Sequence, residues 1–145
     1  MILAPVQRVV LDTNVCLDLF VFKDPRWDGL LAAIESGQVE AITRADCRDE
    51  YHIVLHYKHL PLDAASRPLS AERFDALIKV VAPVPRLDRL PVCTDRDDQK
   101  FLEVARDAQA DILITKDKAL LKLARKTAQA GMFRIMVPEA WLPLP

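Results

Sequence analysis

Four short runs of aliphatic residues alternate with segments of helical periodicity, and this alternation is the strongest constraint on the fold. The runs cover residues 8–12, 39–43, 111–115 and 133–137. Near-continuous apolar runs of this length are typical of parallel strands whose two faces are both covered by helices. The sequence therefore predicts an α/β fold, namely a three-layer α/β/α sandwich with a mainly parallel central sheet.

The segments between these runs carry the periodicity and the terminal residues of helices. We expect helices over residues 15–22, 27–36, 45–59, 70–82, 95–109 and 118–130. Ser70 is the expected N-cap of the fourth helix, and Gly37 is the expected C-cap of the second. Residues 61–68 are expected to form an exposed loop.

The length and composition limit the possible classes of protein. A chain of 145 residues with 51% hydrophobic and 28% charged residues fits one domain, residues 1–145, with a substantial core. The formal net charge of −1 argues against a uniformly basic surface for nucleic acid, but a local basic patch is compatible with it. Because the chain has only three glycines, it contains neither the G-x-G-x-x-G motif nor the P-loop.

The cysteines and the hydropathy pattern bear on where the protein is found. The three cysteines are far apart in sequence and form no C-x-x-C pair, so we expect free, buried thiols in a reducing cytoplasm. No segment approaches the roughly 18 consecutive apolar residues of a transmembrane helix. We therefore expect a cytoplasmic protein that has no membrane partner.

Acidic residues lie at the carboxyl ends of two predicted strands. Asp12 ends the run at residues 8–12, and Asp117 follows the run at residues 111–115 by two residues. Open α/β folds bind their ligands at this edge of the sheet. Both carboxylates are therefore candidates for a functional site.

Two further acids lie on the apolar sides of predicted helices. Glu50 shares its helix face with Cys47, Val54 and other apolar residues, and Asp98 shares its face with Phe101. A buried carboxylate is costly unless it has a cation, a hydrogen-bond partner or a raised pKa. Asp97 points to another face and is the weaker candidate.

Each of these acids also has a simple local explanation. Asp95 and Asp98 have the spacing of an N-cap and an N3 residue, Asp117 can cap the next helix, and Asp12 can form an Asx turn with Asn14. Capping alone explains less well why four segments direct an acid to one edge. Clustered carboxylates repel one another, and one or two divalent cations with oxygen ligands usually relieve that repulsion. On the residues alone, both explanations stay open.

In their order and spacing, several short motifs together resemble the PIN domain family, and in particular bacterial PIN proteins described as toxin components of toxin–antitoxin systems. The resemblance covers nearly the whole chain, residues 8–142. It rests on VVLDTN at residues 9–14, Glu50 within DEYHIVL at residues 49–55, DDQKFLEVA at residues 97–105, ADILITKD at residues 110–117 and VPEAWL at residues 137–142.

The resemblance implies a Mg²⁺- or Mn²⁺-dependent ribonuclease. The family pattern maps its metal-binding and catalytic acids onto Asp12, Glu50, Asp98 and Asp117. Asn14, Asp97 and Thr115 are the expected supporting residues.

The turn before the helix at residues 118–130 departs from the family pattern. Related sequences often have Gly-Asp-x-Asp there, whereas this chain has Lys116-Asp117-Lys118-Ala119 and so lacks one auxiliary acid. We expect Lys116 and Lys118 to contact the phosphates of an RNA substrate, which would make binding sensitive to salt.

Other chemistries have less support. His52, His56 and His59 share one face of the helix predicted at residues 45–59 and could hold zinc, but no cysteine or acid completes such a site, and a solvated face is the simpler explanation. A phosphohydrolase of the haloacid-dehalogenase type would need a second aspartate where Asn14 stands. The principal alternative to a ribonuclease is a non-catalytic nucleic-acid-binding or regulatory protein with the same fold.

The resemblance to toxin components also implies partners. A small antitoxin is expected to cover the acidic edge, for example by inserting an arginine or a lysine. Leu17, Phe20 and Phe22 either belong to the core or offer an apolar surface for a homodimer.

Overall fold

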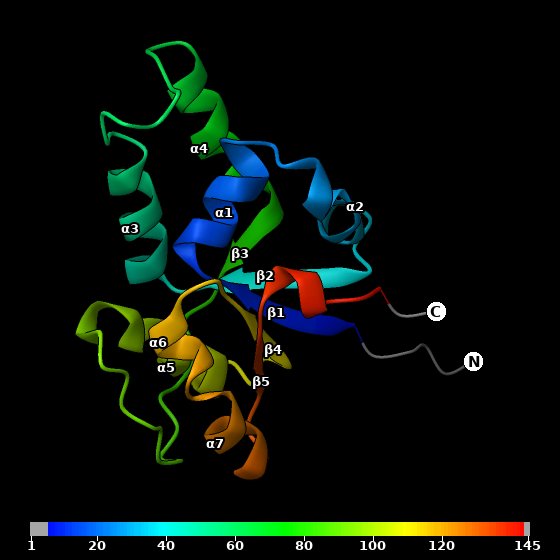
Figure 1. The fold of residues 1–145 in the computed structure, drawn as a ribbon, viewed down its shortest axis with the longest axis vertical. Coiled ribbons are helices and arrows are strands. Elements are labelled where there is room, and N and C mark those ends of the chain that lie inside the picture. The colour runs from blue at the N-terminus through cyan, green and yellow to red at the C-terminus, as the bar shows by residue number, and fades with distance from the viewer. Residues whose placement is uncertain (1–5, 144–145) are drawn as a thin grey trace.

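A five-stranded parallel sheet organises the protein, whose computed structural model describes residues 6–143 (Figure 1). The strands are ordered β3-β2-β1-β4-β5, with β1 at the centre. All four pairings are parallel, as predicted. The strand bounds are β1 Gln7–Leu11, β2 Val39–Thr43, β3 Ile78–Val80, β4 Ile112–Ile114 and β5 Arg134–Met136.

Helices cover both faces of this sheet and complete the predicted α/β/α sandwich (Figure 1). The helices on one face are α1 Thr13–Phe20, α2 Asp28–Glu35, α3 Ala45–Val54 and α4 Ser66–Leu77. The helices on the other face are α5 Gln99–Asp107, α6 Lys118–Leu121 and α7 Ala124–Gln129. Three 3₁₀ turns add η1 Pro25–Trp27, η2 Arg96–Asp98 and η3 Pro138–Ala140.

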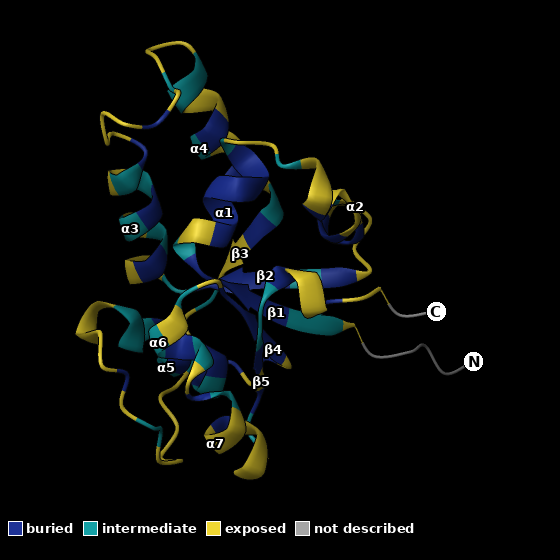
Figure 2. Cartoon of the chain, viewed as in Figure 1, coloured by how far each residue is buried: buried dark blue, intermediate teal, exposed yellow. Residues whose placement is uncertain are grey.

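The central strand shows why its residues Val9–Leu11 are all apolar. Val9 and Leu11 pack into the core shared with α1–α4, whereas Val10 packs into the core shared with α5–α7. All three are buried, and Figure 2 shows the centre of the sheet in the colour of buried residues. Alternate residues point to opposite faces of a strand, so a strand covered on both faces has no position for an exposed polar residue.

Three helical segments differ from the prediction. The helix expected at residues 45–59 ends at Val54, because the N–H groups of His56 and Tyr57 bond to carbonyls three residues back and tighten the chain. The loop expected at residues 61–68 already contains the start of α4, where the Asp63 carboxylate accepts hydrogen bonds from the backbone of Ala65 and Ser66. The helix expected at residues 118–130 is divided into α6 and α7.

The segment from residue 70 to residue 80 differs more. Ser70 is not an N-cap: it lies inside α4, where its buried hydroxyl donates to the carbonyl oxygen of Phe20 at 3.2 Å. The helix also ends at Leu77, and β3 pairs with β2. The β-branched residues Ile78 and Val80 suit a strand once the open edge of β2 is available to pair with.

The three apolar residues considered for a dimer surface have different environments. Leu17 and Phe20 belong to the core and cannot form a surface, because both side chains are buried, and the Phe20 ring packs against Tyr51 of α3 and Phe74 of α4. Phe22 is half exposed. Among residues 6–143, no helix is long and apolar enough to span a membrane.

A buried hydroxyl links α3 to α4 and gives a test of this packing. Tyr51 lies fully buried on α3 and donates from its hydroxyl to the Ser70 carbonyl oxygen at 3.1 Å. Tyr51→Phe should lower the free energy of unfolding by about 1 kcal/mol, because it removes one buried hydrogen bond and keeps the ring. Tyr57→Phe is the matched control, since Tyr57 is half exposed, and should change stability by less than about 0.5 kcal/mol. Urea unfolding measures both, and equal effects would contradict the assignment.

Candidate metal centre at the carboxyl edge of the sheet

The site lies where the connections from two neighbouring strands diverge. β1 and β4 are paired at the centre of the sheet, but the chain leaves β1 toward α1 on one face and leaves β4 toward α6 on the other. This divergence opens the carboxyl edge of the sheet between the two strands. Asp12 directly follows β1, and Asp117 lies in the turn after β4.

Asp12 is held from both sides. One carboxylate oxygen accepts from the backbone N–H of Asn14 at 2.7 Å, which caps α1. The other accepts from the hydroxyl of Thr115, and that hydroxyl oxygen itself accepts from the backbone N–H of Asp117 at 3.0 Å. Thr115 follows β4 and is completely buried. Its hydrogen bond to Asp12 therefore joins the ends of β1 and β4 through a side chain. The side chain of Asn14 is exposed, and its contribution here is its backbone N–H.

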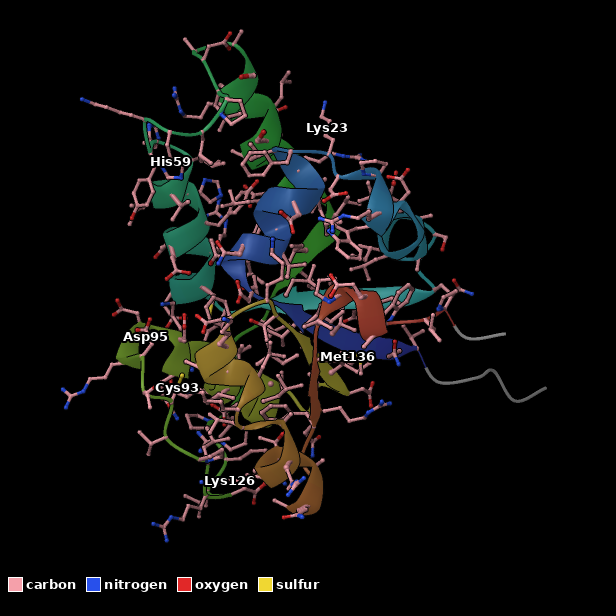
Figure 3. All side chains as sticks on the ribbon, in the orientation of Figure 1. Lys23, His59, Cys93, Asp95, Lys126 and Met136 are labelled. Atoms are coloured by element: carbon pink, nitrogen blue, oxygen red, sulfur yellow. The ribbon has the colours of Figure 1, made fainter. Side chains whose placement is uncertain are left out.

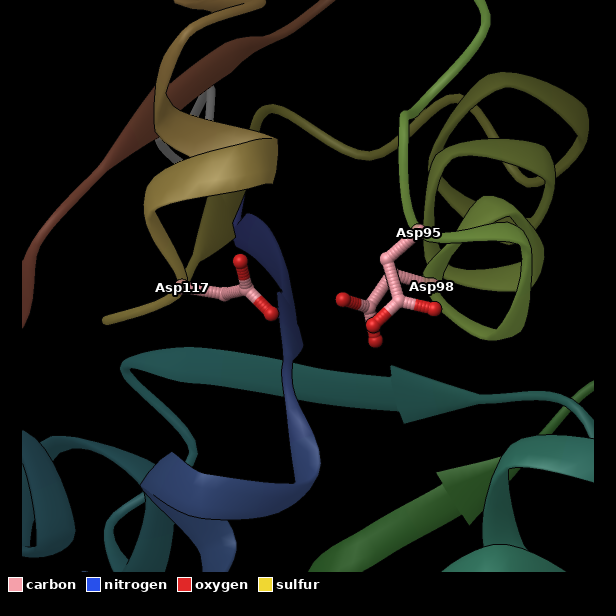
Figure 4. Close-up of side chains that lie close together, drawn as sticks. All are labelled: Asp95, Asp98 and Asp117. Carbon is pink, nitrogen blue, oxygen red and sulfur yellow. The ribbon is translucent and has the colours of Figure 1, made fainter.

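Three other carboxylates form a group, which we call the carboxylate cluster: Asp95, Asp98 and Asp117. One oxygen of each lies within 4.8 Å of the others. Asp95 and Asp98 come from the turn η2 at the start of α5, and Asp117 comes from the start of α6 (Figure 4). Their side chains point toward one another across the end of β1. The Oδ2 atom of Asp98 is buried and has no hydrogen-bond partner among the described residues.

The pKa values record the crowding of these acids. Burial raises the pKa of Asp98 to about 8, and the neighbouring Asp117 adds to the rise. A hydrogen bond with Asp98 lowers the pKa of Asp117, so these two carboxyl groups share a proton in the metal-free protein. Burial also raises the pKa of Asp12, although hydrogen bonds from Thr115 and Asn14 oppose that shift.

Glu50 borders the site but has partners of its own. Its Oε1 atom accepts from the Lys100 ammonium at 2.9 Å, and its Oε2 atom accepts from the Thr13 hydroxyl. It is not part of the carboxylate cluster, although its negative charge contributes to the raised pKa of Asp12. The structure thus places Asp12, Asp98 and Asp117 at one edge of the sheet. Glu50 lies beside them, and its carboxylate is already paired with the Lys100 ammonium.

The sequence pattern predicts only a capping role for Asp95 and indicates no role for Lys100. Asp95 is indeed a cap, since it accepts from the Asp97 N–H at 3.0 Å, but its carboxylate also faces Asp98 and Asp117. The signal that was available is the Asp-x-x-Asp spacing at the start of a helix. The Asp97 side chain is exposed and outside the cluster, and its carbonyl oxygen accepts from Lys100.

The two lysines beside Asp117 differ in their surroundings. Lys116 pairs with Asp18 of α1 at 2.7 Å, and its side chain is 39% exposed. Lys118 is exposed at the first position of α6. Both therefore lie at the rim of the site, but only Lys116 is held by an acid among the ion pairs of residues 6–143.

The three histidines do not assemble a zinc site. His52 contacts Asp75 at 3.4 Å, and His59 lies beyond the end of α3. Figure 3 shows His59 far from Asp95, near the opposite end of the molecule from Lys126. A zinc site would need all three histidines on one helix. Because α3 ends at Val54, His56 and His59 lie outside it and the three no longer share a helix face.

The raised pKa of Asp98 predicts how the metal-free protein responds to pH. The pKa is about 8 in the folded state and about 4 in the unfolded state, so the contribution of Asp98 to stability is lost as pH rises from about 4 to 8. Asp98→Asn does not titrate and can donate to Asp117. The variant should therefore gain an advantage that grows with pH, reaching about 1–2 kcal/mol at pH 8 after allowance for solvent screening.

Urea unfolding with EDTA at pH 5 and pH 8 measures this difference. Asp97→Asn is the matched control one residue away, and because the Asp97 side chain is exposed, the variant should stay within about 0.5 kcal/mol of the wild type. A less stable Asp98→Asn protein at pH 8 would contradict the repulsion described above.

Comparison with known families agrees with the parallel α/β fold and identifies the family. The PIN domain family matches residues 8–119, which are 112 of the 145 residues and include Asp12, Glu50, Asp98 and Asp117. A search of curated proteins found no match to this chain. PIN domains are generally nucleases and usually use divalent metal ions. The resemblance seen in the sequence is therefore confirmed at the level of the family, and the chain belongs to the PIN domain family.

Proposed function

We propose that the protein is a metal-dependent endoribonuclease that hydrolyses RNA phosphodiesters at the carboxyl edge of its sheet. The observation that carries the proposal is the carboxylate cluster, which lies at the divergence point of a PIN domain fold. Repulsion among these carboxylates lowers the stability of the folded protein. If this edge of the sheet had only a structural role, the protein would be more stable without them, so we infer that they serve a function.

The residues of the site fit Mg²⁺ or Mn²⁺. Three carboxylates from two elements offer hard oxygen ligands within 4.8 Å of one another, and the buried Oδ2 of Asp98 lacks a hydrogen-bond donor among the described residues. Asp12 adds a fourth carboxylate, whose oxygens retain lone pairs beyond the hydrogen bonds that they accept. We assign Asp95, Asp98, Asp117 and Asp12 as the residues that would hold the cation.

The chain itself supplies orientation. When bound, a divalent cation supplies Lewis acidity toward a phosphoryl oxygen and lowers the pKa of water. Asp12 is fixed by Thr115 and by the Asn14 N–H, and Asp117 is fixed by the Ala119 N–H at 2.8 Å. Carboxylates held in this way do not have to reorganise when the phosphodiester binds, which lowers the barrier to hydrolysis.

Lys116 and Lys118 support RNA as the substrate. Lys116 and Lys118 are the two sequence neighbours of Asp117. Lys118 is exposed at the rim, and the Lys116 ammonium forms an ion pair with Asp18. In this proposal the two lysines contact phosphates that flank the scissile bond. Their ammonium groups recognise the backbone without reading its bases, so affinity should fall as salt concentration rises.

We also propose that the protein is the toxin of a toxin–antitoxin pair. A small antitoxin would inhibit it by placing an arginine or lysine at the acidic edge. The support is that this edge already accepts one cationic side chain, since the Lys100 ammonium lies 2.9 Å from Glu50 with 18% of its side chain exposed. Co-expression with the product of an adjacent small reading frame should yield a complex whose RNA cleavage is suppressed. Unchanged cleavage in that complex would contradict the toxin assignment.

A non-catalytic RNA-binding protein with the same fold is the second candidate. The observation that favours it is Ala119, which stands where related sequences often have an auxiliary acid. That position is half-buried at the start of α6, and its methyl group offers no ligand to a cation.

Asp12→Asn separates the two functions. It removes a carboxylate charge and keeps the size of the side chain, so RNA cleavage should fall about 100-fold or more while RNA binding persists. Cleavage of a labelled RNA with Mg²⁺ or Mn²⁺, and with EDTA as the metal-free reference, measures the loss. Equal and negligible cleavage by wild type and Asp12→Asn across metals and substrates would establish the non-catalytic function.

The double variant Lys116→Ala, Lys118→Ala tests substrate binding independently. It should weaken RNA binding and reduce the slope of log affinity against log salt by about one to two, because each lysine neutralises about one phosphate. Lys126→Ala is the matched control, since Figure 3 places Lys126 on α7, far from Asp95. A salt slope unchanged from wild type would remove both lysines from the RNA path.

A further inference from the structure

Lys100 is a cation built into the acidic edge. It lies in the first turn of α5, two residues after Asp98, and its ammonium reaches across to α3, where it meets Glu50 at 2.9 Å. The same ammonium donates to the carbonyl oxygen of Asp97. Its side chain is 18% exposed and that of Glu50 is 28% exposed, so water screens this ion pair less than it would screen a pair on the open surface.

The surroundings of Lys100 keep it charged. Its ammonium lies 2.9 Å from a Glu50 carboxylate oxygen, and the opposite charge of that carboxylate favours the protonated lysine. The ammonium also lies 5.4 Å from the centre of the Phe101 ring, a further favourable contact for a cation. Lys100 therefore carries a positive charge at neutral pH.

The acids of this edge fall into two groups. The carboxylate cluster has no ammonium or guanidinium partner among the ion pairs of residues 6–143, whereas Glu50 has both of its oxygens engaged, one by Lys100 and one by Thr13. A divalent ion placed on Glu50 would have to displace the Lys100 ammonium. A divalent ion placed on the cluster displaces no ammonium or guanidinium group among the ion pairs of residues 6–143.

We propose that Lys100 is the second cation of this site, so that the protein binds one divalent ion at the carboxylate cluster and uses the lysine in place of a second ion at Glu50. The inference rests on the proposed metal-dependent function and deepens it by assigning Glu50 to hold Lys100. In this arrangement Lys100 compensates charge beside the reacting phosphate, while the metal is held by Asp95, Asp98 and Asp117.

The test is the number of Mn²⁺ ions bound per chain, without RNA, from titrations followed by the electron paramagnetic resonance of free Mn²⁺. The wild type should bind one ion. Lys100→Met keeps the length of the side chain, removes its charge and leaves Glu50 without a cationic partner, so it should bind two. Lys100→Arg keeps the charge and is the matched control, and it should bind one.

The double variant Lys100→Met, Glu50→Gln distinguishes charge compensation from a disturbed fold. It removes both charges of the pair, so binding should return to one ion, which a merely misfolded protein would not do. Glu50→Gln alone should keep one ion with an affinity within about threefold of wild type, whereas Asp98→Asn should lose about tenfold or more.

The outcomes separate this inference from the proposed function. One ion in the wild type and one in Lys100→Met, with unchanged affinity, would make Lys100–Glu50 an ordinary link between α3 and α5 and would overturn the inference alone. Two ions in the wild type would overturn it as well. No Mn²⁺ bound to the wild type would overturn the metal-dependent function, and the inference with it.

Discussion

The hydrogen bond between the Thr115 hydroxyl and the Asp12 carboxylate is the contact on which the rest of the site depends. It joins the ends of β1 and β4, the two strands whose connections run to opposite faces of the sheet. The Thr115 hydroxyl oxygen also accepts from the Asp117 N–H, so one buried side chain sets the positions of two acids. Because the edge opens at this point, its polar groups would otherwise be free to reorient in water.

Electrostatic repulsion is the cost of this arrangement, and the fold limits it by local means. Asp98 and Asp117 share a proton, Asp12 accepts two hydrogen bonds, and Glu50 is neutralised by Lys100. Each device acts by direct contact with the acid concerned, although the partner comes from a distant part of the sequence in every case except the Asn14 N–H. The acids can therefore stay close without a compensating ion for every charge, which is what a site that takes up and releases cations requires.

The sequence predicts the three layers and the central strands well, but it predicts poorly where individual helices end and where the edge strand β3 begins. The run at residues 39–43 forms β2 with the predicted bounds, since a strand covered on both faces is mostly apolar. By contrast, β3 was missed because Ile78–Val80 follows a helix directly, and only the open edge of β2 selects the extended conformation. The end of α3 at Val54 likewise depends on a tightened last turn that no residue type announces. Tertiary context decides such positions.

In the sequence, helix capping and metal binding are alternative explanations for each acid, and this limits how much of the candidate site the sequence predicts. The structure shows that they are compatible. Asp12 caps α1 with Oδ1, Asp95 caps η2 with Oδ1, and Asp117 caps α6 with Oδ1.

A carboxylate has two oxygens and about four acceptor positions, so a cap uses one and fixes the direction of the other. Asp98 is the exception, since it makes no capping hydrogen bond, and its Oδ2 is the buried oxygen without a partner among the described residues. The caps thus orient three acids around one that has no structural duty. An acid at a helix start is therefore evidence for a site only when its second oxygen faces other acids, which requires the fold and cannot be predicted from the spacing alone.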